Sequence, residues 1–315
     1  MQETIYEMNE KVVVIVGPTA SGKSELAQRI AEEIDGEVIS ADSMQIYRGL
    51  DIGTGKVTAS EQRVLHYGID LIEPGESYSA ALYQEYARRS IDKIKSRGKT
   101  PILCGGTGFY VRAVIDDYDF SEGNQEENLL REEIQNETSN LSNQAVWELL
   151  NDLDSTSASV IEPNDRKRVI RAIELYKRGE SYAKNKDSLK NITEKIDSVW
   201  IGLKVDREIL ANRISNRVDN MISSGLVEEV KSLCNVGFRE ALCSPKAIGY
   251  KEIIEYLDGK ISLDQAVINI KTNSRRYAKR QRTWFRAEKR INWLNADILD
   301  FDSLLLQSLE IIKAL

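Results

Sequence analysis

The chain has only one histidine, three cysteines and five prolines among its 315 residues. Because His66 is the single histidine, a Ser-His-Asp or Cys-His mechanism would have to pass through it, so a carboxylate is the better candidate for proton transfer. The cysteines Cys104, Cys234 and Cys243 are odd in number and lack the close paired spacing of a zinc site. We therefore expect structural thiols rather than a metal cage.

Long apolar runs are also missing. The longest are of strand length, and residues 1–10 are polar and acidic, so the sequence predicts neither a membrane span nor a signal peptide. The cytoplasm is the expected location. Hydrophobic residues make up 41% of the chain, which is enough for one large α/β domain with an insertion or a second domain.

A phosphate-binding loop stands near the start of the chain, directly after the apolar run Val12–Val16. Its pattern requires glycines, whose backbone lets N–H groups curl around phosphate oxygens, and a lysine that supplies positive charge. The following serine can ligate Mg²⁺ at the start of a helix whose dipole favours anions. The residues expected to bind phosphate are Gly17, Pro18, Thr19, Ala20, Ser21, Gly22, Lys23 and Ser24.

Strands and helices alternate along the first third of the chain. Predicted helices over Glu25–Ile34 and Ala80–Ser96 separate strands, which favours βαβ units and a parallel, doubly wound α/β sheet like that of P-loop NTPases. The predicted strands are Val12–Val16, Glu37–Ser40, Pro101–Cys104 and Ser198–Leu203. Segments that follow parallel strands meet at one edge of the sheet, so we expect Gly17–Ser24, Ala41–Tyr47 and Gly105–Tyr110 to converge on one cleft.

An insertion interrupts this core. From 116 to 197 the chain becomes rich in Asn, Ser, Glu and Lys, and its apolar residues are spaced for short helices. The prediction is a catalytic core made of residues 1–115 and 198–315, with C-terminal helices, and an inserted helical domain between them.

The loop after the second strand offers a carboxylate. Asp42 stands two residues after Ser40, where it could either do chemistry at the strand's carboxyl end or cap a turn. The stretch Leu50–Lys56 is rich in glycine, and we expect a surface loop near the same mouth, most of it a plain connector.

The strand Pro101–Cys104 ends without the acid that usually holds Mg²⁺ in nucleotide-hydrolysing P-loop proteins. Glycines and a hydroxyl, Gly105 to Gly108, stand there instead. Such a turn either lets a substrate approach the backbone, with Thr107 bonding a phosphate or a base, or serves only for tight packing.

The formal net charge is −7, yet Lys271–Arg290 holds nine basic residues and one acid, Glu288. Ser262 and Gln265 resemble a capping box that opens a helix there. Its predicted buried face is Val267, Ile270, Tyr277 and Trp284, and its predicted basic face is Arg275, Lys279, Arg282 and Arg286. A solvated helix side is the ordinary explanation, but the scarcity of acids favours contact with a nucleic-acid backbone.

Taken together, the motifs resemble those of the tRNA dimethylallyltransferases, also called tRNA isopentenyltransferases. The resemblance runs in order from residue 12 to about 293, is highly specific as a combination, and is of the bacterial type. It rests on Gly17–Ser24, Ser40–Tyr47, Asp51–Thr54, Gly105–Gly108 with Tyr110, Pro163–Asp165 ahead of Arg168 and Arg171, and Ala278–Gln281 ahead of Thr283 and Trp284.

The resemblance implies transfer of a dimethylallyl group from dimethylallyl diphosphate to N6 of adenosine 37, beside the anticodon of tRNA. It implies a diphosphate on the phosphate loop, bridged by Mg²⁺ at Ser24, where a kinase would hold ATP. Asp42 is the family's base, and Thr19 and Thr107 lie near the reacting groups. Arg213 and Arg217, four residues apart on one helix face, match family arginines, with Arg217 aimed at the diphosphate or either one in a surface ion pair.

For tRNA, the resemblance points to the anticodon stem-loop and to residues in several segments, with the protein expected to act as a monomer. These are Asp42, Ser43, Met44, Gln45, Lys167, Arg168, Val169, Ile170, Arg171, Tyr250, Lys251, Arg275, Lys279, Arg280, Gln281 and Arg282. Two alternatives remain. A small-molecule or nucleoside kinase would consume ATP without needing the basic helix, and an RNA-binding ATPase would not need Asp42 or Gly105–Gly108.

Overall fold

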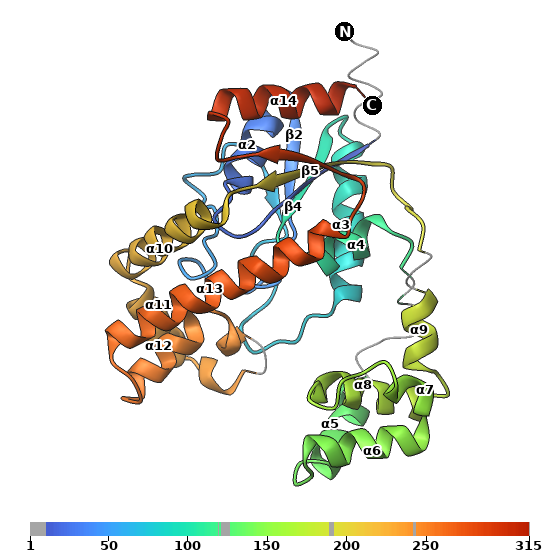
Figure 1. Ribbon diagram of the computed structural model, residues 1–315. Helices are drawn as coiled ribbons and strands as arrows, with labels where there is room; N and C mark the ends of the chain where they lie inside the picture. Colours follow the sequence, from blue (N-terminus) through green and yellow to red (C-terminus); the bar gives the residue numbers. More distant parts are fainter. Residues whose placement is uncertain (1–10, 119, 121–126, 189–191, 242–243, 315) are drawn as a thin grey trace. The chain divides into compact units, whose positions relative to one another are not determined.

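A six-stranded parallel sheet forms the centre of the larger of two units (Figure 1). The computed structural model describes residues 11–118, 120, 127–188, 192–241 and 244–314. The strand order is β3-β2-β4-β1-β5-β6, so the phosphate loop follows a central strand. The strands are β1 (Val12–Val16), β2 (Gly36–Ser40), β3 (His66–Tyr67), β4 (Thr100–Gly105), β5 (Ser198–Lys204) and β6 (Ile291–Asn295).

Strand β1 is apolar throughout because helices cover the sheet on both faces. Its five residues are all buried, with Val13 and Ile15 in the core on one face and Val14 on the other. Residue Val14 is level with Leu103 of β4 and with Trp200 of β5, so the register runs unbroken across the central strands.

Helices pack on each face of this sheet. On one face lie α2 (Lys23–Glu33), α14 (Phe301–Lys313) and the first half of α10 (Arg207–Ser223). On the other lie α3 (Ala80–Lys95) and α4 (Gly108–Ile115), where the rings of Tyr83 and Tyr110 stack with centroids 4.0 Å apart.

A third apolar cluster lies beyond the carboxyl ends of the strands. It joins α10 to α11 (Leu226–Cys234), α12 (Tyr250–Leu257) and the long α13 (Leu263–Arg286), which lies beside α10 (Figure 1). Ile46, Tyr47 and Leu50, from the loop after β2, are buried in the same cluster. This packing ties the loops around the cleft to a helical layer.

Residues Asp116–Glu194 form the second unit, which is helical and has its own core. Its helices are α5 (Glu127–Glu137), α6 (Asn143–Leu153), α7 (Ser155–Ala158), α8 (Arg166–Lys177) and α9 (Tyr182–Ser188). A fully buried carboxylate, Glu174, is paired with Arg131 and Arg171, at 2.7 and 2.5 Å. The sequence predicted that this insertion ends at residue 197, three residues after the observed end at Glu194.

The parallel α/β sheet flanked by helices is confirmed. Each of the four predicted strands matches an observed strand to within one residue at either end. The helix predicted over Ala80–Ser96 ends one residue earlier, at Lys95. Two strands, β3 and β6, were not predicted. In α13 the buried face was partly wrong: Trp284 is 40% exposed, and Ala266, Ile270, Ala278, Gln281 and Phe285 are the buried residues.

No helix within the described residues is long and apolar enough to span a membrane. Of the three cysteines, Cys104 is buried and Cys234 is half-buried. Cys243 lies outside the described residues.

Candidate active site

A single pocket collects the three segments predicted to converge at the carboxyl edge of the sheet. It spans about 620 Å³, the part open to solvent included. Its lining residues are Thr19, Lys23, Ser24, Val38, Ser40, Asp42, Gln45, Thr54, Gly55, Val57, His66, Ile69, Cys104, Gly105, Arg217, Tyr277 and Gln281. All of them belong to the larger unit.

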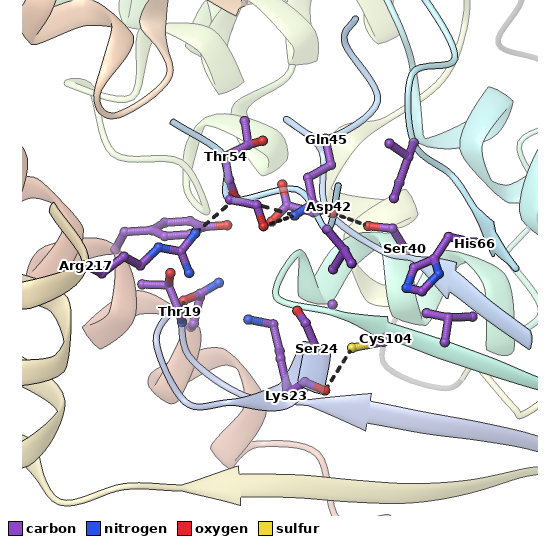
Figure 2. Close-up of a pocket in the computed structure, with 17 residues that line it drawn as sticks. Thr19, Lys23, Ser24, Ser40, Asp42, Gln45, Thr54, His66, Cys104 and Arg217 are labelled. Carbon is purple, nitrogen blue, oxygen red and sulfur yellow. Dashed lines mark hydrogen bonds between the residues drawn. The ribbon is translucent and has the colours of Figure 1, made fainter. Parts of the chain in front are cut away.

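The cationic part of the pocket comes from two elements. Lys23 begins α2 directly after the phosphate loop, and Arg217 projects from α10. In Figure 2 the amino group of Lys23 and the guanidinium of Arg217 point toward a common space beside Thr19, with Ser24 next to it. Two positive charges beside a helix N-terminus make this space a site for a polyphosphate or diphosphate.

These two cations lie in a desolvated place. Burial lowers the pKa of Lys23, and the charge of Arg217 lowers it further, whereas Asp42 raises it. Burial also lowers the pKa of Arg217, against the effect of Asp42. A bound anion would neutralise this pair of charges, so the site gains from binding one.

Asp42 stands across the pocket from the phosphate loop (Figure 2). One of its carboxylate oxygens accepts a hydrogen bond from the backbone N–H of Met44 at 2.9 Å, so Asp42 does cap a turn. Both roles that the sequence left open are therefore compatible: the turn orients the side chain, and the side chain lines the pocket.

The turn after β2 is held to the turn after β4. The backbone N–H of Ser43 donates to the hydroxyl of Thr107 at 3.1 Å, and the side chain of Ser40 bonds that of Gln45 at 2.7 Å. Thr107 is thus fixed beside the Asp42 turn, although it is not among the lining residues.

Helix α13 closes the pocket through two side chains. The buried side chain of Gln281 accepts a hydrogen bond from the backbone N–H of Thr19 at 2.8 Å and donates one to the carbonyl of Gly106 at 3.0 Å. Gln281 therefore links the phosphate loop to the loop after β4. Burial raises the pKa of Tyr277 to about 12, which keeps its hydroxyl protonated at neutral pH. The sequence predicted that Gln281 contacts tRNA; its observed partners are in the protein.

Part of the pocket lining is apolar or uncharged. It comprises Val38, Val57 and Ile69, together with His66 and with Cys104, whose thiol lies 3.6 Å from the carbonyl oxygen of Lys23. Burial raises the pKa of Cys104 to about 11, so the thiol is protonated at neutral pH. Burial lowers the pKa of His66, whose Nδ1 lies 2.8 Å from the carbonyl of Val64. A neutral imidazole and a neutral thiol suit a hydrocarbon group better than a second anion.

A magnesium ion fits this donor set only with help from a ligand. Within the described part of the chain, no group of three or more His, Cys, Asp or Glu side chains could hold a metal by itself. Mg²⁺ commonly takes one or two protein oxygens and completes its shell with phosphate oxygens and water. The hydroxyl of Ser24 lines the pocket and is an oxygen donor of this kind.

Several predicted residues are not brought to the pocket. Arg213 donates to the carbonyl of Ala296 at 3.1 Å and is not a lining residue, in contrast to Arg217 one turn later. Tyr250 is fully buried and donates to Glu229, so its predicted contact with tRNA is wrong for the side chain. In the smaller unit Val169 and Ile170 are also buried in the core, and the same correction applies.

The other predicted tRNA contacts are accessible. Lys167, Arg168, Lys251, Arg275, Lys279 and Arg280 are exposed, and Arg171 and Arg282 are half-buried. On α13 the guanidinium of Arg280 lies over the ring of Tyr277, 5.6 Å from its centroid. Lys271 forms an ion pair with Asp219, and Arg290 forms one with Glu288. Fewer of the nine basic residues between Lys271 and Arg290, here called the basic stripe, are therefore open to a partner than the sequence indicated.

Sequence reasoning missed much of the lining. Thr54 and Gly55 belong to a stretch interpreted mainly as a connector, yet they line the pocket, and Leu50 and Lys56 within it are buried. Tyr277 was predicted to be a core residue. The spacing of apolar residues along α13 was the only sequence signal for Tyr277, and it did not distinguish a core residue from one that lines the pocket.

A parallel sheet with a phosphate loop after a central strand, facing a carboxylate across the cleft, defines a P-loop protein of the α/β class. The comparisons narrow this class. A family model described as IPP transferase matches residues 45–288, and the chain belongs to this family.

Relatives of nearly full length agree. The chain is 44% identical to the tRNA dimethylallyltransferase of Carboxydothermus hydrogenoformans over 92% of this chain and 93% of the relative. It is 42% identical to the tRNA dimethylallyltransferase of Halalkalibacterium halodurans over 95% of this chain and 96% of the relative. Among solved structures, a tRNA isopentenylpyrophosphate transferase from Staphylococcus epidermidis has a TM-score of 0.71 at 41% identity and covers 96% of this chain and 98% of its own. A eukaryotic dimethylallyltransferase acting on tRNA has a TM-score of 0.80 at 28% identity, and the match covers 96% of this chain and 78% of that one.

Proposed function

We propose that this protein transfers a dimethylallyl group from dimethylallyl diphosphate to N6 of adenosine 37 in tRNA. The observation that carries the proposal is the pocket itself, in which Lys23, Ser24 and Arg217 face Asp42 in a chain of the IPP transferase family. The names of the relatives support the reaction class, since they are called tRNA dimethylallyltransferases.

The donor's diphosphate would bind at the phosphate loop. Lys23 and Arg217 supply positive charge where the leaving group gains negative charge, which is the stabilisation that counts in the transition state. Thr19 lines the pocket beside them. The donor's hydrocarbon would then lie toward Val38 and Ile69.

The acceptor reaction needs a base. The amino group of adenine is a weak nucleophile because its lone pair is delocalised into the ring. As N6 bonds to C1 of the donor, the C1–O bond breaks and diphosphate leaves with the bonding electrons. The proton from N6 passes to the carboxylate of Asp42, which lines the pocket opposite the cations.

Ser24 would hold a Mg²⁺ ion, whose charge would further neutralise the departing diphosphate. No phosphoryl group is transferred in this reaction. The lack of an acid at the end of β4 is therefore consistent with the proposal.

The tRNA would contact the exposed cations of α13 through its anticodon stem-loop. A loop base is easier to extrude from its stack than a paired base, so adenosine 37 could enter the pocket at modest cost. Lys167, Arg168 and Arg171 of the smaller unit are further candidates for the stem backbone. We propose that the monomer is the active form and that it acts in the cytoplasm, where tRNA is found.

The test combines the purified protein with labelled dimethylallyl diphosphate and unmodified tRNA, and uses ATP as a control donor. We expect label in the tRNA, released by digestion as N6-dimethylallyladenosine. Transfer of phosphate from ATP to a small acceptor, with tRNA left unlabelled, would contradict the proposal and support a kinase.

Replacing Asp42 by alanine should lower the transfer rate by about 10²-fold or more, the range of a positioned general base. The affinity for tRNA should change little, since the charge removed is a negative one. Asp92→Ala on α3 is the matched control because this carboxylate is exposed and outside the pocket. Equal turnover of the two variants would remove Asp42 as the base.

A further inference from the structure

The carboxylate of Glu229, on α11, collects an unusual number of donors from the loop Asp51–Lys56. One oxygen accepts the backbone N–H groups of Ile52 at 2.8 Å and Asp51 at 3.3 Å, and the other accepts that of Gly53 at 3.3 Å. The hydroxyl of Tyr250 completes the set at 2.6 Å. Charge-assisted hydrogen bonds of this kind fix backbone more firmly than neutral ones.

Tyr250 is built for this contact. Its side chain is fully buried, and its ring leaves no space beside Gly53, where an added Cβ would lie 2.4 Å from a ring carbon. Burial and the neighbouring Glu229 raise its pKa, so the hydroxyl remains a donor. Tyr250 and Glu229 therefore grip the start of the loop together.

The end of the same loop is anchored by a buried lysine. Lys56 is buried and bonds the carbonyl of Tyr47 at 2.6 Å and the carboxylates of Asp51 and Asp70 at 2.8 and 2.5 Å. We call residues 51–56 the strap. It is fixed at both ends, and only its middle faces the pocket.

The middle of the strap holds a catalytic cation. The carbonyl of Thr54 accepts a hydrogen bond from Nη2 of Arg217 at 3.0 Å, a contact drawn in Figure 2. Gly55 has a φ of +63°, and a Cβ added there would lie 2.2 Å from the same Nη2. Arg217 therefore rests directly on the strap, and any shift of the strap would shift the guanidinium.

We propose that Glu229 and Tyr250 are positioning residues for Arg217, acting through the strap rather than touching either substrate. This inference rests on the proposed function, in which Arg217 binds the donor's diphosphate. It also gives Tyr250 a role other than the tRNA contact that the sequence indicated.

The test uses Glu229→Gln and Tyr250→Phe, which keep the side-chain shape. Glu228→Gln, an exposed neighbour on α11, and Tyr256→Phe, on α12 with Tyr250, are the matched controls. We expect the KM for dimethylallyl diphosphate to rise about tenfold in the test variants, the effect of one lost charge-assisted hydrogen bond. The KM for tRNA should stay within about twofold, and the controls should behave like wild type.

A double-mutant cycle separates positioning from general loosening of the fold. In an Arg217→Lys background, Glu229→Gln should add less than about twofold, because the group it positions is already lost. Effects that simply multiply would overturn the proposal, as would a rise confined to the KM for tRNA.

Binding of inorganic diphosphate, measured by calorimetry, gives a readout that does not depend on transfer. If wild type transfers nothing to tRNA, the proposed function fails. The positioning proposal is still tested, since Glu229→Gln should weaken diphosphate binding about tenfold. Unchanged diphosphate affinity in both variants would refute it.

Discussion

The link between the phosphate loop and α13 can be broken by one substitution. Gln281→Leu keeps the size of the side chain and removes both hydrogen bonds, which leaves the N–H of Thr19 and the carbonyl of Gly106 without a partner. A buried polar group left unpaired costs about 1–3 kcal/mol. The Thr19 bond is partly accessible to water, so we assign about 1–2 kcal/mol to it and about 1–3 kcal/mol to the buried Gly106 bond.

The expected loss in unfolding free energy is therefore about 2–5 kcal/mol, measured by urea denaturation. Gln265→Leu is the matched control, since this glutamine is exposed on the same helix, and it should change stability by less than about 0.5 kcal/mol. Amide hydrogen exchange gives local evidence: the peptide that contains Thr19 should lose protection in Gln281→Leu only.

Kinetics then decide between a bridge and an RNA contact. If Gln281 orients the phosphate loop, the variant should raise the KM for dimethylallyl diphosphate and leave that for tRNA nearly unchanged. If the stability and the donor KM match wild type while only the KM for tRNA rises, the reasoning is refuted. Gln281 would then be the tRNA contact that the sequence predicted.

Two further predictions concern charge. Because burial lowers the pKa of Lys23 and a bound anion would raise it, diphosphate binding should take up a proton and weaken as pH rises through the lowered pKa. Calorimetry in buffers of different ionisation enthalpy measures this proton uptake. The Lys23→Arg variant should take up no proton on binding. Equal proton uptake in this variant and in wild type would show that the proton goes to the diphosphate instead. Arg280→Glu should weaken tRNA binding and reduce the slope of log affinity against log salt by about 1, whereas Lys231→Glu, exposed on α11, should not. An unaltered slope for Arg280→Glu would count against the basic stripe as an RNA surface.

The sheet and the phosphate loop were predictable because their signals are local. An apolar run such as Val12–Val16 followed by a glycine-rich loop and a helical pattern needs no tertiary information. The short strand β3, two residues at a sheet edge, carries no such signal. Tyr250 shows the opposite limit: its motif marks it as important, but only its burial against Gly53 and Glu229 distinguishes an anchor from a ligand contact.

The glycines after β4 show how a P-loop fold comes to place its carboxylate elsewhere. A Cβ at Gly105 would lie 2.1 Å from the carbonyl oxygen of Ala41, and one at Gly108 would lie 1.8 Å from Nε1 of Trp284. The loop is therefore packed against the β2 turn and α13, and Gly105 also lines the pocket. An acid has no room where these glycines stand. The same packing brings the β2 turn against the β4 loop, where Ser43 bonds Thr107, and so presents Asp42 to the pocket from the neighbouring strand.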